Sequence, residues 1–125
     1  MAFEIINPES LGRPSGWNHG MLAAAGGRLL FVAGQISPIG DFVAQWDGAV
    51  GRVLAVVKAA GGRPEDIAMM RIYTTDRPGY LANLTALGEV HRKHMGRHYP
   101  AMVLVEVKSL VDSQALVEIE ATAVL

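Results

Sequence analysis

The chain contains no cysteine, which excludes a disulfide framework, a thiolate-bound iron–sulfur cluster and a thiol nucleophile. Long apolar segments are also absent. Uninterrupted apolar runs, such as residues 29–33, are only a few residues long, whereas a transmembrane helix needs about 20. The N-terminus lacks the basic stretch followed by an apolar one that marks a secretory signal peptide. We therefore expect a cytoplasmic protein with no membrane segment.

An excess of charge of either sign is missing as well. The chain has 11 basic and 12 acidic residues, for a net charge of −1. Such a balance provides no general attraction for nucleic acids or anionic lipids, so neither is an expected partner. Glycine-rich phosphate loops and the Gly-x-Ser-x-Gly nucleophile motif do not occur either. These absences disfavour nucleic-acid binding, nucleotide binding and serine hydrolase chemistry.

Apolar residues, by contrast, are abundant. They make up 50% of the 125 residues, and the mean hydropathy is positive. A chain of this length can form one domain, residues 1–125, with a core of its own. The remaining apolar surface predicts that the chain associates with other copies of itself.

Glycine and proline divide the chain into short elements. Apolar residues spaced by three or four predict two amphipathic helices, at residues 42–60 and 76–95. The pair Gly26-Gly27 predicts a hairpin turn between the second and third strands. Two helices and one mixed sheet predict a two-layer α+β sandwich with both helices on one face. The expected strands are residues 3–6, 17–24, 28–33, 67–75, 101–107 and 116–124.

Two acids on the last predicted strand are the first candidates for chemistry. Strand alternation puts Glu118 and Glu120 on the same side, about 7 Å apart. It also predicts that Met102 and Leu104 share this sheet face, opposite the helices. A partly buried carboxylate can have a raised pKa and act as a general acid or base. The alternative is a pair of solvated acids on an edge strand, or acids paired with Arg71 or Lys108.

Gly34 and Trp17 are two further candidates. Gly34 ends an apolar strand, where the lack of a side chain allows the backbone to approach a ligand closely. The alternative is an ordinary turn at the end of the strand. Trp17 follows a loop rich in glycine and proline and can line a pocket. The alternative is a hydrophobic plug.

Three histidines lie near the end of the second predicted helix, at His91, His94 and His98. Two histidines at such spacing can bind a metal ion. The chain has neither a His-Glu-x-x-His signature nor cysteine, and basic side chains at a helix C-terminus also complement the helix dipole. We expect no metal site.

Several short motifs, taken in order along nearly the whole chain, resemble the Rid/YjgF family of small trimeric enamine/imine deaminases. Each motif is weak alone, and their common order and spacing make the resemblance specific. The motifs are Asn7-Pro8, Phe31-Val32-Ala33-Gly34-Gln35, Tyr99-Pro100-Ala101, Val105-Glu106-Val107 and Glu118-Ile119-Glu120-Ala121.

The resemblance implies a chorismate-mutase-like fold. Three subunits would pack their sheets into a central barrel with the helices outside, and ligand clefts would lie between neighbouring subunits. The family reaction hydrolyses a reactive enamine or imine to a carbonyl compound and ammonia. It uses neither a metal ion nor an organic cofactor. The expected partner is a small-molecule metabolite.

The resemblance also assigns roles to individual residues. Glu118 matches the glutamate that positions the attacking water, and Gly34 matches a glycine whose backbone contacts the ligand. Trp17 falls where the family has a cleft tyrosine. Thr85 takes the position of an asparagine that the family has in its second helix, or Asn83 does if the gap in the alignment is placed differently. The substrate-binding set is Trp17, Gly34, Thr85, Met102, Leu104 and Glu120.

One family residue is missing. The family has an arginine directly after Pro-Ala that clamps the substrate carboxylate, and here Met102 stands in its place. Leu104 replaces a cysteine that is common two positions later. Either another cation, Arg13 or Arg71, supplies the clamp, or the ligand carries less charge. Two functions therefore stay open: an enamine/imine hydrolase with altered substrate, and a non-catalytic trimer that binds a small metabolite.

Overall fold

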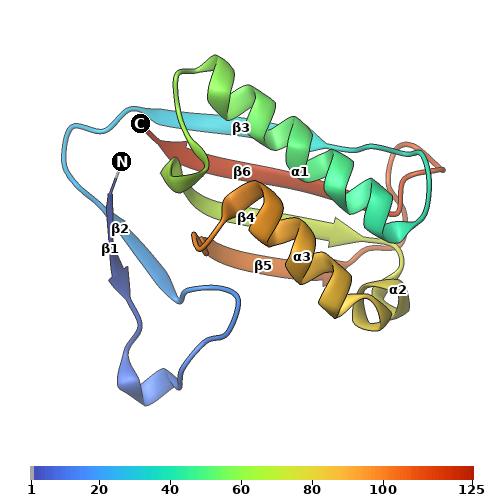
Figure 1. The fold of residues 1–125 in the computed structure, drawn as a ribbon, viewed down its shortest axis with the longest axis horizontal. Helices are drawn as coiled ribbons and strands as arrows, with labels where there is room; N and C mark the ends of the chain where they lie inside the picture. Colours follow the sequence, from blue (N-terminus) through green and yellow to red (C-terminus); the bar gives the residue numbers. More distant parts are fainter. Residues whose placement is uncertain (1) are drawn as a thin grey trace.

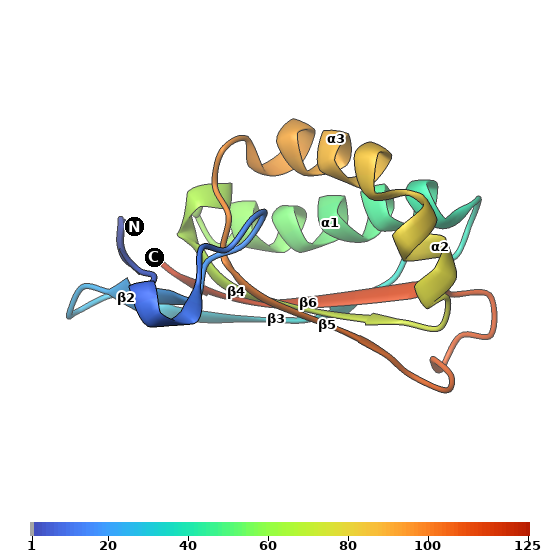
Figure 2. The same cartoon turned by 90° about the horizontal axis from the view of Figure 1, so that it is seen from below.

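The computed structural model describes residues 2–125 and shows a sheet of four strands with helices on one face (Figures 1 and 2). The strand order is β3-β6-β4-β5, with β4 parallel to β5 and antiparallel to β6. The predicted two-layer α+β architecture with a mixed sheet is confirmed. The strands are β1 (Phe3–Ile6), β2 (Gly20–Ala23), β3 (Leu29–Gln35), β4 (Ile67–Thr74), β5 (Ala101–Glu106) and β6 (Val117–Val124). The helices are α1 (Phe42–Ala59), α2 (Arg77–Ala82) and α3 (Leu84–Met95), with 3-10 turns at Glu9–Leu11 and Pro64–Asp66.

Helix α1 forms where the apolar spacing predicted it. The carboxylate of Asp41 caps it by accepting a hydrogen bond from the backbone N–H of Ala44 at 2.9 Å, which satisfies a donor that the first turn would otherwise leave unpaired. Its apolar stripe, including Trp46, Val50 and Val53, is buried. The stripe packs against β3 and β6 and fixes the helix across the sheet.

The second predicted helix consists of two pieces, α2 and α3, separated at Asn83. The side-chain amide of Asn83 donates to the carbonyl oxygen of Gly79 at 2.7 Å. Asparagine side chains that bond to nearby backbone in this way compete with the helical hydrogen bonds. The local bond explains why the chain turns here although the apolar spacing continues.

The predicted hairpin between β2 and β3 is wrong. β2 pairs with β1 in a separate two-stranded sheet, and β3 pairs with β6. Arg28 exchanges both of its backbone hydrogen bonds with Leu125, at 2.8 and 2.9 Å, so β3 begins alongside β6. β2 is also shorter than predicted, and Trp17 lies in the loop before it.

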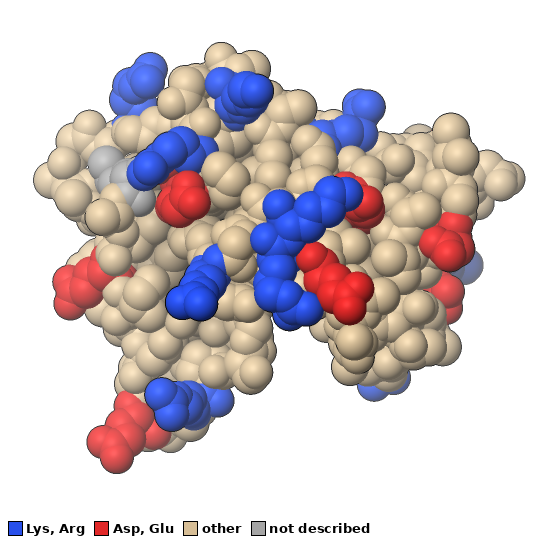
Figure 3. All heavy atoms as spheres, in the orientation of Figure 1, with Lys and Arg blue, Asp and Glu red and all other residues tan. Residues whose placement is uncertain are grey.

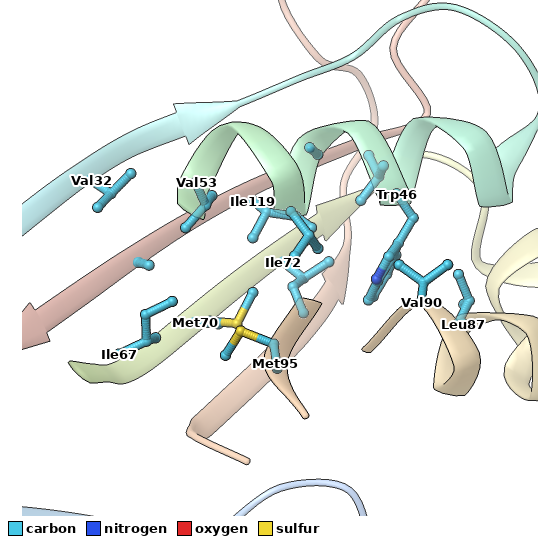
Figure 4. Close-up of a cluster of buried hydrophobic side chains, with 14 of the residues drawn as sticks. Val32, Trp46, Val53, Ile67, Met70, Ile72, Leu87, Val90, Met95 and Ile119 are labelled. Atoms are coloured by element: carbon cyan, nitrogen blue, oxygen red, sulfur yellow. The ribbon is translucent and has the colours of Figure 1, made fainter. Parts of the chain in front are cut away.

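The hydrophobic core lies between the helices and the sheet (Figure 4). Every second residue of β6 from Val117 to Ala123 is buried and faces the helices. The core includes Val32, Val53, Ile67, Met70, Ile72, Leu87, Val90, Met95 and Ile119. The alternate residues of β6, which include Glu118 and Glu120, lie on the opposite face. No helix within residues 2–125 is both long and apolar enough to cross a lipid bilayer.

We call the sheet face opposite the helices the open face. Figure 2 shows that both long helices lie on the other side of the sheet. The open face carries apolar side chains with large exposed fractions: 74% for Phe31, 41% for Val103 and 42% for Val105. A monomeric protein seldom exposes an apolar patch of this kind on a sheet face.

Candidate functional site

The predicted site residues lie in two groups on opposite faces of the sheet. Glu118, Glu120 and Gly34 belong to the open face, whereas Met102 and Leu104 pack on the helix side. The expectation that Met102 and Leu104 share a face with the two acids is therefore wrong.

The pairing of β4 with β5 explains this correction. Met102 lies beside Met70 and Leu104 beside Ile72, and both of these β4 residues are in the core. Met102 and Leu104 do lie on the same face as each other, as the alternation of side chains along β5 predicts. The phase of one strand relative to another depends on their pairing, and a shift by one residue moves every side chain to the other face.

On the open face, the structure brings Glu118 and Gly34 together. A Cβ atom on Gly34 would lie 2.5 Å from Oε2 of Glu118 and 2.8 Å from its Cδ. The carboxylate therefore rests against bare backbone of β3, close to an irregularity between Val32 and Gln35 in the pairing of β3 with β6. Bulges of this kind are common next to functional sites, where they re-aim a strand. A larger residue at this position would displace the carboxylate from the backbone of β3.

The two acids differ in their hydrogen bonding. The hydroxyl of Tyr73 donates to the carboxylate of Glu120. This hydrogen bond, reinforced by burial, raises the pKa of Tyr73. Glu118 has no hydrogen-bond or ion-pair partner among residues 2–125, so its carboxylate is available to a ligand or a water. Tyr73 was not predicted as a site residue, and only the register of β4 with β6 reveals it.

On the helix side, a groove of about 580 Å³ runs between α2, α3 and β5. Figure 3 shows the surface hollowed between the N-terminal loops and the helices. Three predicted site residues, Trp17, Met102 and Leu104, line it. Among residues 2–125, no lysine, arginine, aspartate or glutamate lines it. Further aromatic side chains in its walls are Trp46, Tyr80 and Tyr99.

Hydrogen bonds from asparagines hold Trp17 at the groove. The side-chain amide of Asn18 donates to the carbonyl oxygen of Tyr99 at 2.6 Å, and its backbone N–H donates to that of Pro100 at 3.2 Å. The amide of Asn7 donates to the Asn18 side chain at 2.8 Å. The N-terminal loop is thereby fastened to the start of β5, next to the groove.

His91 lines the groove from α3. Its ring stacks on that of Tyr99, with centroids 4.5 Å apart and planes 6° from parallel. Its Nε2–H donates to the carbonyl oxygen of His98 at 2.8 Å. Burial is the main cause that lowers the pKa of His91, so the ring is neutral near pH 7.

The other two histidines of the helix end have separate partners. His94 pairs with Asp47, and His98 bonds to the carbonyl oxygen of Ile67 at 2.7 Å. Within residues 2–125, the structure assembles no group of three or more histidine, aspartate or glutamate side chains that could hold a metal ion.

The remaining predicted residues lie outside the groove. Thr85 is exposed on α3, and Asn83 is engaged at the end of α2. Arg13 borders a separate hollow among the N-terminal loops. Arg71 lies on the open face, with Nη1 3.5 Å from Oγ1 of Thr122. Neither arginine lines the groove of its own chain.

The comparisons with known proteins agree with this architecture. The family model described as endoribonuclease L-PSP matches residues 13–125. YyfB from Yersinia pestis, a Rid-family protein of unknown function, is 30% identical over 100% of both chains with a TM-score of 0.84. Rv2704 from Mycobacterium tuberculosis, of the YjgF/YER057c/UK114 family, is 30% identical over 98% of this chain and 99% of its own, with a TM-score of 0.68. Escherichia coli TdcF, solved with bound serine, is 28% identical over 91% of both chains, with a TM-score of 0.67. No curated protein matches.

The fold places the chain among the small YjgF-like α+β proteins. More specifically, it belongs to the endoribonuclease L-PSP family, which is the Rid/YjgF family that its motifs resemble. Membership in this family supports a role in processing small molecules.

Proposed function

We propose that the chain hydrolyses a reactive enamine or imine to a carbonyl compound and ammonia, in a cleft formed between copies of the chain. The observation that carries this proposal is the partner-free carboxylate of Glu118 seated on Gly34. Glu118 accepts a proton from a water whose oxygen bonds to the carbon of the C=N group. The electron pair of the C=N π bond moves to the nitrogen, which takes the proton that Glu118 held, so that a neutral carbinolamine forms. Glu118 then carries the hydroxyl proton of the carbinolamine to the nitrogen, the C–N bond breaks, and ammonia leaves a C=O group behind.

The geometry of one chain supports a cleft between copies. A ligand in the groove lies on the helix side of the sheet, whereas Glu118 lies on the open face. Val103 lines the groove and is also exposed, so the groove reaches the sheet edge formed by β5. A second copy on the apolar open face would bury Phe31 and Val105 and bring a groove next to Glu118. The arrangement we propose is the trimer that the family resemblance implies.

The absence of charge in the groove bears on the substrate. A carboxylate taken from water into an apolar site without a cation is strongly disfavoured. The motif resemblance puts Met102 at the position of the family arginine, and Met102 lines the groove without offering a charge. We therefore expect the chain to process neutral imines in preference to 2-imino acids.

The experiment measures imine decay by semicarbazide trapping. An amino acid oxidase generates 2-imino acids in place, and an amine oxidase acting on arylmethylamines generates neutral imines. The protein is expected to accelerate the decay of neutral imines, and Glu118→Gln to reduce this acceleration by about 100-fold or more. The matched control is Glu89→Gln, which changes an exposed acid on α3 outside the groove. Full activity in Glu118→Gln would refute the proposal.

A second candidate is a non-catalytic trimer that binds a small metabolite. The uncharged, aromatic groove favours it, since Met102 and Leu104 suit an apolar ligand. It predicts that the protein does not accelerate imine decay and that apolar compounds raise its melting temperature.

The nuclease activity in the family's description has little electrostatic support, since the net charge is −1 and acidic and basic side chains are interspersed on the helix side (Figure 3).

A further inference from the structure

His91 lines the groove and has one ring nitrogen that is free to accept a hydrogen bond. The carbonyl oxygen of His98 can only accept, so the hydrogen bond at 2.8 Å puts the proton of the ring on Nε2. In a neutral ring, Nδ1 then carries a lone pair. No side chain or backbone group within residues 2–125 donates a hydrogen bond to Nδ1.

Three features keep the ring neutral and in place. The flat stack on Tyr99 restricts its rotation. Burial is the largest effect and lowers the pKa of His91, and the positive charge of Arg92 acts in the same direction, whereas the hydrogen bond to the carbonyl oxygen of His98 acts against them. A neutral ring with its proton on Nε2 has an acceptor at Nδ1, whereas an arginine side chain offers only donors.

The rest of the groove selects against charge and in favour of flat apolar groups. Trp17, Tyr80 and Tyr99 contribute aromatic surface, and no lysine, arginine, aspartate or glutamate in the described part of the chain lines the walls. Aromatic ligands pack well against such rings in stacked or edge-on arrangements. A volume of about 580 Å³ lies within the range of small-molecule sites, where a few polar groups fix the orientation of a mainly apolar ligand.

We propose that the groove binds a neutral, ring-bearing compound whose N–H or O–H group donates a hydrogen bond to Nδ1 of His91. The inference rests on the proposed function because it assumes that the substrate binds in the groove, and it adds the chemical class of that substrate. The N–H of a neutral enamine or imine is a donor of this kind. His91 thus orients the ligand by a hydrogen bond, in place of the missing carboxylate clamp.

The test compares two rings of nearly equal shape by isothermal titration calorimetry of the full chain. Indole has an N–H donor, and benzofuran has an oxygen in its place. The wild type is expected to bind indole about five- to tenfold more tightly than benzofuran, a ratio that corresponds to the free energy of one neutral hydrogen bond. His91→Phe keeps a ring for Tyr99 to stack on and removes the acceptor, so the preference is expected to disappear.

Two further variants control for structural damage. His91→Gln retains an amide that can donate to His98 and accept from the ligand, and it is expected to keep part of the preference. His94→Gln changes a histidine of the same helix that pairs with Asp47 and does not line the groove, and it is expected to keep all of it. Circular dichroism and the melting temperature show whether each variant is folded.

Several outcomes would overturn the inference. They are equal binding of indole and benzofuran to the wild type, no binding of either, an unchanged preference in folded His91→Phe, and binding of indole-3-carboxylate as tight as that of indole. The imine assay runs in parallel and separates the two proposals. Hydrolysis without an indole preference refutes this inference alone, whereas an indole preference without hydrolysis refutes the proposed function alone.

Discussion

Replacing Gly34 by alanine tests the pairing of glycine and glutamate on the open face. The added Cβ would lie 2.5 Å from Oε2 and 2.8 Å from Cδ of Glu118, whereas non-bonded heavy atoms prefer about 3.5–4.0 Å. The carboxylate must therefore move by about 1 Å, which a glutamate side chain can do by rotating. A displacement of about 1 Å in a catalytic group can reduce the rate about 100-fold.

The stability of this variant is expected to change little. Overpacking costs about 1–3 kcal/mol when the neighbours cannot move, but here the neighbour is the end of a flexible side chain. Alanine is also favoured over glycine in a strand by about 0.5–1 kcal/mol, which offsets part of the strain. Gly34→Ala should therefore lose imine hydrolysis while keeping its melting temperature within a few degrees of the wild type.

The matched control is Gly51→Ala in α1, where the new Cβ would make an ordinary contact at 3.6 Å with Cε1 of His94. It should keep activity and gain stability, because alanine favours a helix interior. Two results would refute the reasoning. Full hydrolysis by Gly34→Ala would show that the position of Glu118 does not matter, and global unfolding would show that the glycine serves the fold.

Three other predictions follow from the site and the open face. The hydrogen bond to Glu120 raises the pKa of Tyr73 in the folded chain. This bond therefore stabilises the fold below about pH 10, the pKa of an unfolded tyrosine, and the stabilisation is lost as the pH rises through the higher pKa of the folded state. Tyrosinate absorbance should show one late-titrating group, which Tyr73→Phe removes. Burial lowers the pKa of His91, so the unfolded chain takes up a proton before the folded one does, and stability should fall as the pH drops below about 6.5. His91→Phe should lessen this acid sensitivity, as measured by urea unfolding at two pH values. Phe31→Lys places a charge on the open face, and sedimentation should show an oligomer for the wild type and a smaller species for the variant; an unchanged species would place the interface elsewhere.

The parts of the fold that depend on local chemistry were predictable from the sequence. Helix α1 needed only the cap at Asp41 and the apolar stripe, because neighbouring turns of one helix determine both. The side of β6 that carries Glu118 followed from alternation in one strand. The break at Asn83 was missed, because the periodicity continues through it and a single side-chain bond ends the helix.

The parts that depend on pairing between distant segments were not predictable. Met102 was placed on the wrong face because the sequence does not specify how β5 registers with β4. The structure places Gly34 against the carboxylate of Glu118, and the spacing of these residues in the sequence does not reveal this proximity between β3 and β6. The sequence did not reveal the role of His91 in the groove, because its stacking on Tyr99 and its place among the lining residues arise from tertiary packing.

The placement of acid and groove on opposite faces of one sheet has a genetic consequence. If each cleft takes Glu118 from one copy and the groove from its neighbour, no chain works alone, and two differently defective chains can complement each other. Copies carrying Glu118→Gln, mixed with copies whose groove is filled by Gly88→Trp, would contain some neighbouring pairs in which both halves are intact. Activity would then reappear on mixing two inactive proteins, and dominance relations between alleles would depend on which half each allele damages.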